Sequence, residues 1–247
     1  MSDIRGKVAF ITGSSRGIGA GIARRFAQAG ARVAVHGRDP AALEAVRSEL
    51  DAFAVTGDVT RLADVEAAVR RVEDALGPID ILVVNAASGF AMPGPIEETT
   101  EDAWRSTLDG VLTSAFFTLK AVLPGMKQRR RGAIVAISST AGRRPHARSP
   151  VPYAAAKAAL QLMMQDVALQ AGPFGVRVNC VAPETILTEK NLQRIPEPVR
   201  AQLVQAHPIQ RLGVPEDVAD AALFLASDAS AWITGAILDV AGGNQGV

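Results

Sequence analysis

The chain has 247 residues, and its 26 lysines and arginines against 25 aspartates and glutamates give a formal net charge of +1. Apolar residues make up 48% and charged residues 21%, which are ordinary globular values and exclude a disordered chain. The balanced charge argues against a nucleic-acid-binding protein, which would need a basic surplus.

The longest apolar runs are about as long as a strand, too short for a membrane span or a signal-peptide core. We therefore expect no membrane contact. Cys180 is the single cysteine and cannot form an internal disulfide, which favours a cytoplasmic location. It lies in an apolar run and is interpreted as a core residue. The histidines lack metal-ligand spacing, so no catalytic metal is predicted.

Short apolar runs alternate with helical stretches along the chain, and several runs are almost continuously hydrophobic, as in strands covered on both faces. Asp39 and Pro40 form an N-cap with a first-turn proline, and Thr60 opens a helical stretch that ends at Leu76. The predicted strands are residues 8–11, 33–36, 53–56, 79–84, 133–137, 176–181 and 236–240. The alternation predicts one α/β domain over residues 1–247, with a single doubly wound parallel sheet of about seven strands.

A glycine-rich turn, residues 12–19 (TGSSRGIG), follows the first predicted strand. Gly13, Gly17 and Gly19 leave room for a pyrophosphate to approach the backbone, and the start of the next helix offers unpaired N–H groups to that anion. The spacing differs from the Gly-x-Gly-x-x-Gly of many dinucleotide folds, and such turns also serve plain packing. Because a strand and a helix flank the turn, we interpret it as a dinucleotide-binding turn.

The residues at the end of the second predicted strand indicate whether NAD(H) or NADP(H) binds. Gly37 stands where an NAD site usually has a carboxylate, Arg38 follows it, and Arg16 comes from the neighbouring glycine turn. Two guanidinium groups suit a 2′-phosphate, so NADP(H) is predicted. The alternative is that both are solvated surface arginines. Asp39 is better explained as a helix cap.

Two further strand ends carry weaker signals. After the third strand, Asp58 and Val59 place a carboxylate where it could meet an adenine amino group, although Asp58 could equally cap the helix near Thr60. After the fourth strand, residues 85–87 (NAA) are small enough to line a cofactor channel.

The strongest local feature is Tyr153 with Lys157, four residues apart and therefore on one face of a helix. A nearby ammonium is expected to lower the phenol pKa, so that the phenol can exchange a proton with a carbonyl or alcohol oxygen. Ser139, at the end of the fifth strand, could donate a hydrogen bond to the same oxygen. Taken alone, the Tyr–Lys pair would more often be a surface pair.

Together these residues resemble the short-chain dehydrogenase/reductase family over nearly the whole chain. The resemblance also rests on residues 177–183 (RVNCVAP), on 233–235 (ITG) and on Gly242 with Gly243. It implies a three-layer Rossmann fold, with a nucleotide-binding half over residues 1–130, a catalytic and substrate half over 131–247 and a lid over 187–212.

The resemblance also implies an enzyme that interconverts CH–OH groups and carbonyls with a nicotinamide dinucleotide. Tyr153 would be the general acid/base, Lys157 would bind the nicotinamide ribose and lower the Tyr153 pKa, and Ser139 would orient the substrate oxygen. The implied cofactor-binding residues are Gly13, Ser15, Arg16, Gly17, Ile18, Gly19, Arg38, Asp58, Val59, Asn85, Ala86, Ala87, Tyr153, Lys157, Pro183, Ile186 and Thr188.

Three positions depart from the family pattern. Val111 stands where an asparagine usually holds a proton-relay water, and Asp109 is on the wrong side of the helix to replace it. Ala87 replaces a glycine, a small change. Glu184 replaces a glycine and is expected to put a carboxylate near the nicotinamide, where it could affect the preferred substrate charge.

The expected substrate is a small-molecule carbonyl or alcohol. The segment of residues 141–152 carries Arg143, Arg144, His146 and Arg148, and could steer an anionic substrate such as a thioester of phosphopantetheine; a solvated loop is the alternative. A basic run at 127–131 could meet an acyl carrier protein or simply end a helix. Trp104 and Trp232 are interpreted as packing anchors. The resemblance implies a homotetramer or homodimer, and the apolar helix at 152–171 could form the main subunit contact.

The predicted function is NADPH-dependent reduction of a carbonyl to an alcohol, with a 3-oxoacyl thioester as a candidate substrate. Two alternatives stay open. One is oxidation of a secondary alcohol or polyol by the same residues in reverse. The other is a non-catalytic dinucleotide-binding relative, for which Val111 is the best support.

Overall fold

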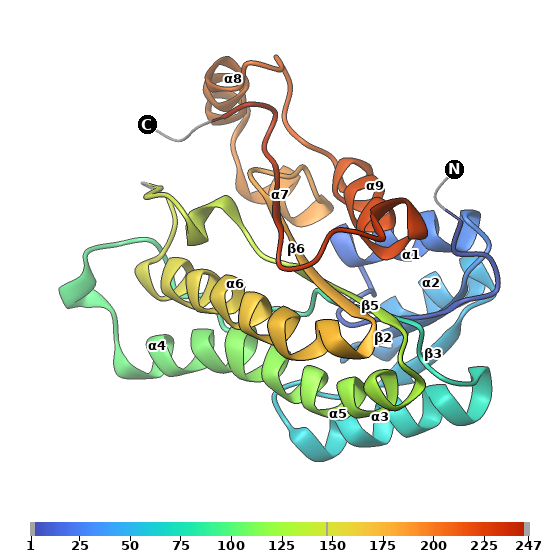
Figure 1. Ribbon diagram of the computed structural model, residues 1–247. Helices are drawn as coiled ribbons and strands as arrows, with labels where there is room; N and C mark the ends of the chain where they lie inside the picture. The colour runs from blue at the N-terminus through green and yellow to red at the C-terminus, as the bar shows by residue number, and fades with distance from the viewer. Residues whose placement is uncertain (1–2, 147, 245–247) are drawn as a thin grey trace.

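The computed structural model describes residues 3–146 and 148–244. Seven parallel strands form one sheet in the order β3-β2-β1-β4-β5-β6-β7, and helices cover both faces (Figure 1). The order reverses between β1 and β4, which opens a crevice at the carboxyl ends of these strands. The strands are β1 (Val8–Ile11), β2 (Arg32–Gly37), β3 (Phe53–Thr56), β4 (Ile81–Val84), β5 (Gly132–Ile137), β6 (Val176–Pro183) and β7 (Ile237–Val240). The predicted three-layer α/β fold is thus confirmed.

The strands are hydrophobic at nearly every position because both faces of the sheet are buried. Along β1, Phe10 packs into the layer of α3, α5 and α6, whereas Ile11 packs into the layer of α1, α2 and α9. The helices are α1 (Gly17–Gln28), α2 (Pro40–Leu50), α3 (Leu62–Leu76), α4 (Glu101–Leu108), α5 (Ser114–Arg129), α6 (Val151–Ala171), α7 (Glu189–Arg194), α8 (Glu197–Ala206) and α9 (Pro215–Ala226). A π-helical turn, Asp109–Thr113, joins α4 to α5.

The predicted helix starts agree with the structure to within two residues. Asp39 caps α2 by accepting hydrogen bonds from the amides of Ala41 and Ala42. The third helix begins two residues after Thr60, because Asp58 ties the amide and hydroxyl of Thr60 into a tight turn before it. The predicted lid region is helical, as α7 and α8.

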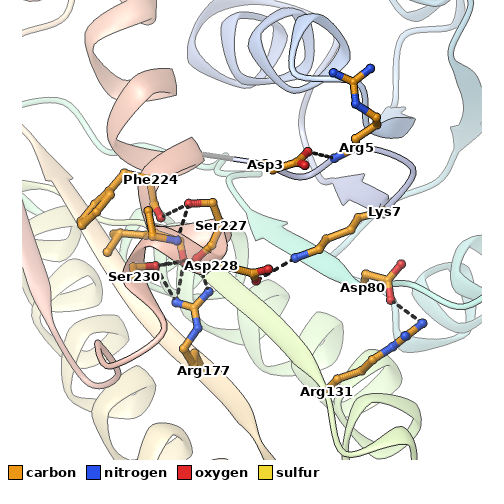
Figure 2. A network of polar contacts seen from close by, with 12 residues as sticks. Asp3, Arg5, Lys7, Asp80, Arg131, Arg177, Phe224, Ser227, Asp228 and Ser230 are labelled. Atoms are coloured by element: carbon orange, nitrogen blue, oxygen red, sulfur yellow. Dashed lines mark hydrogen bonds and ion pairs between the residues drawn. The ribbon is translucent and has the colours of Figure 1, made fainter. Parts of the chain in front are cut away.

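A polar network joins β6 to the chain after α9 at the amino ends of the strands (Figure 2). One nitrogen of Arg177, Nη1, donates to the Leu225 carbonyl at 2.7 Å and to Ser230 Oγ at 2.8 Å, while Nη2 donates to the Ser227 carbonyl at 2.9 Å. Burial lowers the pKa of this guanidinium. Lys7 and Asp228 form an exposed ion pair beside the network. These groups fasten the end of the sheet that lies opposite the crevice.

One packing prediction was wrong. Trp232 is 99% exposed and is no core anchor, because it lies in the turn between the last 3-10 helix (Asp228–Ser230) and β7, on the outer surface. Trp104 is also partly exposed, on α4. Cys180, by contrast, is buried in β6 as predicted. Within residues 3–146 and 148–244, no helix is long and apolar enough to cross a membrane.

Candidate active site

The glycine turn lies at the carboxyl end of β1 and is packed too closely for side chains. Gly13 and Gly17 have positive φ angles of 65° and 56°, which favour glycine. A Cβ at Gly13 would come within 2.7 Å of the Ala86 Cα atom, and one at Gly19 would collide with the Gly13 carbonyl oxygen. These glycines therefore keep open the cradle at the start of α1 where a pyrophosphate would bind.

Three polar side chains hold this turn. Thr12 Oγ1 accepts hydrogen bonds from the amides of Asn85 and Ala86, and Asn85 Nδ2 donates to the carbonyls of Thr12 and Gly13. Ser14 Oγ donates to the Ile11 carbonyl and accepts from the amide of His36. Asn85 thus shapes the cradle through its amide, beyond the channel-lining role predicted for it. Sequence reasoning missed Thr12 and Ser14, whose only signal was their place next to the first glycine.

Arg38 follows β2 directly, and Arg16, the N-cap residue of α1, reaches the same edge with its side chain. Arg16 pairs with Asp39 at 2.7 Å, and Arg38 lies 3.8 Å from Asp58, with both guanidinium groups largely exposed. The sequence argument expected no carboxylate here, yet the turn of the chain brings these two aspartates to the same edge. Arg38 and Asp58 line a hollow of about 560 Å³, together with Pro40, Thr56, Gly57, Asp64 and Ala67.

His36 lies beneath the turn and is nearly inaccessible to solvent. Burial lowers its pKa to about 4, so the ring is neutral at pH 7. The amide of Gly13 points at its Nδ1 atom across 3.5 Å. His36 is therefore a support of the turn and carries no charge to a ligand.

Tyr153 and Ser139 meet at the carboxyl end of β5, as the sequence predicted. The Ser139 hydroxyl accepts from the amide of Ala141 at 3.2 Å and forms a hydrogen bond with the Tyr153 phenol. The Tyr153 ring packs edge-on against Phe90, with ring centroids 5.3 Å apart. Burial raises the pKa of Tyr153, and the Ser139 bond opposes this rise only in part. The expected lowering is thus absent from the protein alone, because desolvation of the phenolate dominates.

Lys157 is buried one helical turn beyond Tyr153. Its Nζ donates to the Ile137 carbonyl at 2.7 Å and lies 5.7 Å from the centroid of the Tyr153 ring. Burial lowers the Lys157 pKa to about 8. One further turn along α6, Gln161 donates to Ser138 Oγ and to the Ser139 carbonyl. Gln161 thereby positions Ser139; it was missed in the sequence, although it continues the spacing of four.

The stretch after β6 crosses to the glycine turn. A Cβ at Gly17 would lie 3.3 Å from the Thr188 methyl group, so these two predicted cofactor residues are neighbours. Ile186 is buried and pairs with Gly213 in an isolated parallel bridge. The Thr188 hydroxyl caps α7 by accepting from the amide of Asn191. Pro183 is the last residue of β6 and fixes where this stretch begins.

Glu184 does not offer a free carboxylate to the site, contrary to expectation. Its oxygens lie 3.3 Å from His146 Nε2 and 2.9 Å from His207 Nε2, and it is buried. These histidines and the Thr185 amide hold the pKa of Glu184 at about 2, against the rise that burial causes. His207 Nδ1 also faces the Leu203 carbonyl at 2.6 Å. The His207 ring thus lies between two acceptors, a carbonyl and a carboxylate.

In the described part of the chain, three of the four basic side chains in the loop before α6 also have acidic partners, the exception being Arg148. Arg143 and Arg144 both pair with Asp239 of β7, at 2.9 and 3.2 Å, and His146 is held by Glu184. These three groups are therefore already matched by acids of this chain, which weakens the expectation that they steer an anionic substrate.

The second basic run closes the end of α5. Arg129 donates to the Ile79 carbonyl, Arg130 to the Pro173 carbonyl, and Arg131 pairs with Asp80. The Lys127 ammonium lies 5.1 Å above the Phe174 ring. Packing of the helix end accounts for these residues without a carrier protein.

Val111 lies buried in the π-helical turn between α4 and α5. Its carbonyl accepts from Ser114 Oγ at 3.3 Å, and its side chain packs in the core. Asp109 is exposed and bonded to Thr113, so it does not replace the family's asparagine. Among the described residues, no group of three or more histidines, cysteines, aspartates or glutamates is arranged to hold a metal ion.

The fold and site define a class: a doubly wound sheet with a glycine cradle at one strand end and a Ser–Tyr–Lys group at another. The family model described as enoyl-(acyl carrier protein) reductase matches residues 13–245. The chain belongs to the short-chain dehydrogenase/reductase family and is an oxidoreductase of CH–OH groups that binds a nicotinamide dinucleotide.

Relatives of similar length act on different substrates. The chain is 38% identical to a cyclohexanol dehydrogenase of Rhodococcus sp. (strain TK6), covering 97% of this chain and 96% of that one. It is 37% identical to a 3-oxoacyl-acyl-carrier-protein reductase of Chlamydia muridarum, covering 96% of each. A 7α-hydroxysteroid dehydrogenase complexed with NADH and 7-oxo glycochenodeoxycholic acid superposes with a TM-score of 0.93, at 36% identity over 98% of this chain and 95% of that one.

Proposed function

We propose that the protein reduces a carbonyl to an alcohol with NADPH, using Tyr153 as the general acid. The observation that carries the proposal is the contact between Ser139 and the Tyr153 hydroxyl beside the buried Lys157. A bound nicotinamide dinucleotide supplies the hydride. The reverse oxidation of an alcohol uses the same residues.

The phenol is well suited to donate a proton. Burial raises the pKa of Tyr153 above its ordinary value, which favours the neutral phenol that can protonate a developing alkoxide. The Ser139 oxygen is fixed by the Ala141 amide, so its proton can turn from the Tyr153 oxygen to the substrate oxygen when a substrate binds. For oxidation the phenol must first lose its proton, and this direction should accelerate as the pH rises.

Lys157 holds a charge beside the reacting groups. Its ammonium is anchored on the Ile137 carbonyl and therefore cannot swing away from Tyr153. With a pKa of about 8, Lys157 is charged at pH 7 and would contact the ribose of the dinucleotide while favouring the phenolate.

The preference for NADPH is supported by the end of β2. Gly37 offers no side chain to the ribose. A Cβ at this position would lie only 3.1 Å from the Ser15 Cβ and Oγ atoms, so a carboxylate side chain has little space here. Arg16 and Arg38 are the cations at this edge, and a 2′-phosphate would compete with Asp39 and Asp58 for them. The proposed cofactor residues otherwise follow the glycine cradle and the stretch from Pro183 to Thr188.

A 3-oxoacyl thioester remains a candidate substrate, supported by the similarity to the Chlamydia muridarum reductase. We also propose a homotetramer or homodimer, supported by the exposed apolar side chains of Leu162 and Leu169 on α6. Light scattering of the purified protein tests the assembly.

The test of the catalytic proposal is steady-state NADPH oxidation with a panel of ketones and 3-oxoacyl thioesters. We expect Tyr153→Phe to lower turnover by about 100- to 10,000-fold with little change in NADPH affinity, since only the transferable proton is lost. Lys120→Met, on the exposed face of α5, is the control. Turnover near that of the wild type in Tyr153→Phe would refute the assignment.

The cofactor proposal has a separate test. Arg38→Ala is expected to weaken NADPH binding by about tenfold, one charge-assisted contact, and to leave NADH binding unchanged. Fluorescence titration with both dinucleotides measures this. Tighter binding of NADH than of NADPH by the wild type would instead assign NAD(H).

A further inference from the structure

The loop after β4 holds Phe90 in a fixed place beside the catalytic tyrosine. The Thr107 hydroxyl of α4 donates to the Gly89 carbonyl at 2.5 Å and accepts from the Ala91 amide at 3.2 Å, so both neighbours of Phe90 are anchored. Gly89 has a φ of 71°, and a Cβ there would collide with the Ser106 carbonyl. These contacts hold the backbone so that it presents Phe90, a residue that the sequence analysis did not single out.

Phe90 and Met92 form an apolar surface next to the reacting hydroxyl. Phe90 meets the Tyr153 ring edge-on and is still 41% exposed, while Met92 is 73% exposed. Apolar side chains left this open beside a catalytic group are suited to pack against the body of a substrate.

Helix α7 brings two cations to the same surface. Lys190 Nζ lies 5.6 Å from the centroid of Phe90, and Arg194 Nη2 lies 4.0 Å from Met92 Sδ. The two cations are four residues apart and so share one face of α7. The helix is held there by Asn191, whose amide donates to the Ile186 carbonyl at 2.8 Å.

These cations differ from Arg143, Arg144 and His146 of the basic loop in having no acidic partner. In the part of the chain that the structure describes, neither Lys190 nor Arg194 lies within 4.0 Å of a carboxylate oxygen. Arg143 and Arg144, by contrast, share Asp239. A negative group on a ligand that rests on Phe90 and Met92 would therefore find two unmatched cations beside it on α7.

We propose that the active site takes carbonyl compounds with an apolar body and a distal carboxylate, the body resting on Phe90 and Met92 and the carboxylate paired with Lys190 and Arg194. This inference rests on the proposed carbonyl reduction at Tyr153. It adds that substrate selection comes from the loop after β4 and from α7, and that Arg143 and Arg144 have a structural role.

The test compares one ketone with and without its charge. The probes are 4-(4-acetylphenyl)butanoic acid and its methyl ester, in which an aromatic ring and a short chain separate the carbonyl from the carboxylate. Binding is measured by calorimetry to the Tyr153→Phe variant saturated with NADPH, so that the measurement does not depend on turnover.

We expect the acid to bind about tenfold more tightly than the ester, as one charge-assisted hydrogen bond would give. The variant Lys190→Met/Arg194→Met should bind both probes equally, with unchanged NADPH affinity. Lys120→Met is the matched control, because Lys120 also lies above a ring, 6.0 Å from the Phe116 centroid, but on α5. Phe90→Ala should weaken acid and ester alike, and Phe90→Leu should restore part of the loss.

Equal binding of the two probes to the protein with intact α7, or a preference that survives the double substitution, would overturn the proposal. So would the absence of acid binding at millimolar concentration. These outcomes can be told apart from failure of the proposed function. Selective binding of the acid without NADPH oxidation by the wild type would reject carbonyl reduction and keep the carboxylate site. NADPH oxidation without selective binding of the acid would keep carbonyl reduction and reject the carboxylate site.

Discussion

The two ends of the sheet use charged side chains in opposite ways. At the amino ends, Arg177 is surrounded by acceptors of its own chain, and Asp80 accepts from the Val8 amide and pairs with Arg131 (Figure 2). At the carboxyl ends, Lys190 and Arg194 have no acidic partner among the described residues. A charge with internal partners stabilises the fold, whereas one without them can respond to a ligand.

The carboxyl ends are not uniform, however. Glu184 and Asp239, at the ends of β6 and β7, are matched by His146, His207 and two arginines. Along this edge of the sheet, the charges at the ends of β6 and β7 are matched within the chain, whereas the cations of α7 are not. We therefore place the boundary of the proposed ligand-binding region between β6 and α7. Three substitutions test where it lies.

The largest effect is expected at Gly19. Gly19→Ala should abolish measurable dinucleotide binding, a loss of about 100-fold or more, because the new Cβ would collide with the Gly13 carbonyl and the Asn85 amide. Gly172→Ala is the control, since its Cβ meets nothing within 4 Å and its backbone is helical. Titration with NADPH measures both. Normal binding by Gly19→Ala would show that the turn can relax and is not the cradle.

At the opposite edge, Arg177→Leu should lower the free energy of unfolding by about 3 kcal/mol, because three hydrogen bonds from a partly buried cation are lost. NADPH affinity should not change. Lys7→Met removes only an exposed ion pair and should cost less than about 1 kcal/mol. Urea unfolding measures the stabilities; a large loss of cofactor affinity in Arg177→Leu would contradict the separation of the two ends.

The smallest effect concerns Glu184 and depends on pH. The folded carboxyl has a pKa of about 2 against an ordinary 4.5, so its contribution is complete above pH 4.5 and is lost as the pH falls towards 2. Glu184→Gln should therefore cost about 2 kcal/mol at pH 7, and the gap to the wild type should narrow below pH 4.5.

Unfolding at pH 7, 5 and 3 gives this comparison, with the exposed Glu97→Gln as the control. A gap that stays constant down to pH 3 would mean that the Glu184 charge contributes nothing to the pair with His146 and His207.

The proximity of the proposed catalytic residues was predictable because it depends on local spacing. Tyr153 and Lys157 lie one helical turn apart, and Ser139 ends a strand that its own apolar pattern defines. The same holds for the glycine turn and for the seven strands, whose hydrophobic runs record burial on both faces. Strand ends shifted by one or two residues, since hydrogen bonding to neighbouring strands sets where each strand stops.

The sequence by itself determined the strands, the glycine turn and the placing of Tyr153 one helical turn before Lys157, since each follows from residues close together in the chain. Only the tertiary structure decided which charges are matched. The acids that hold Arg143 and His146 come from β7 and the end of β6, and the cations beside Phe90 come from α7, about 100 residues further along the chain. An ion pair depends on distance in space, which the fold sets and the order of residues does not reveal.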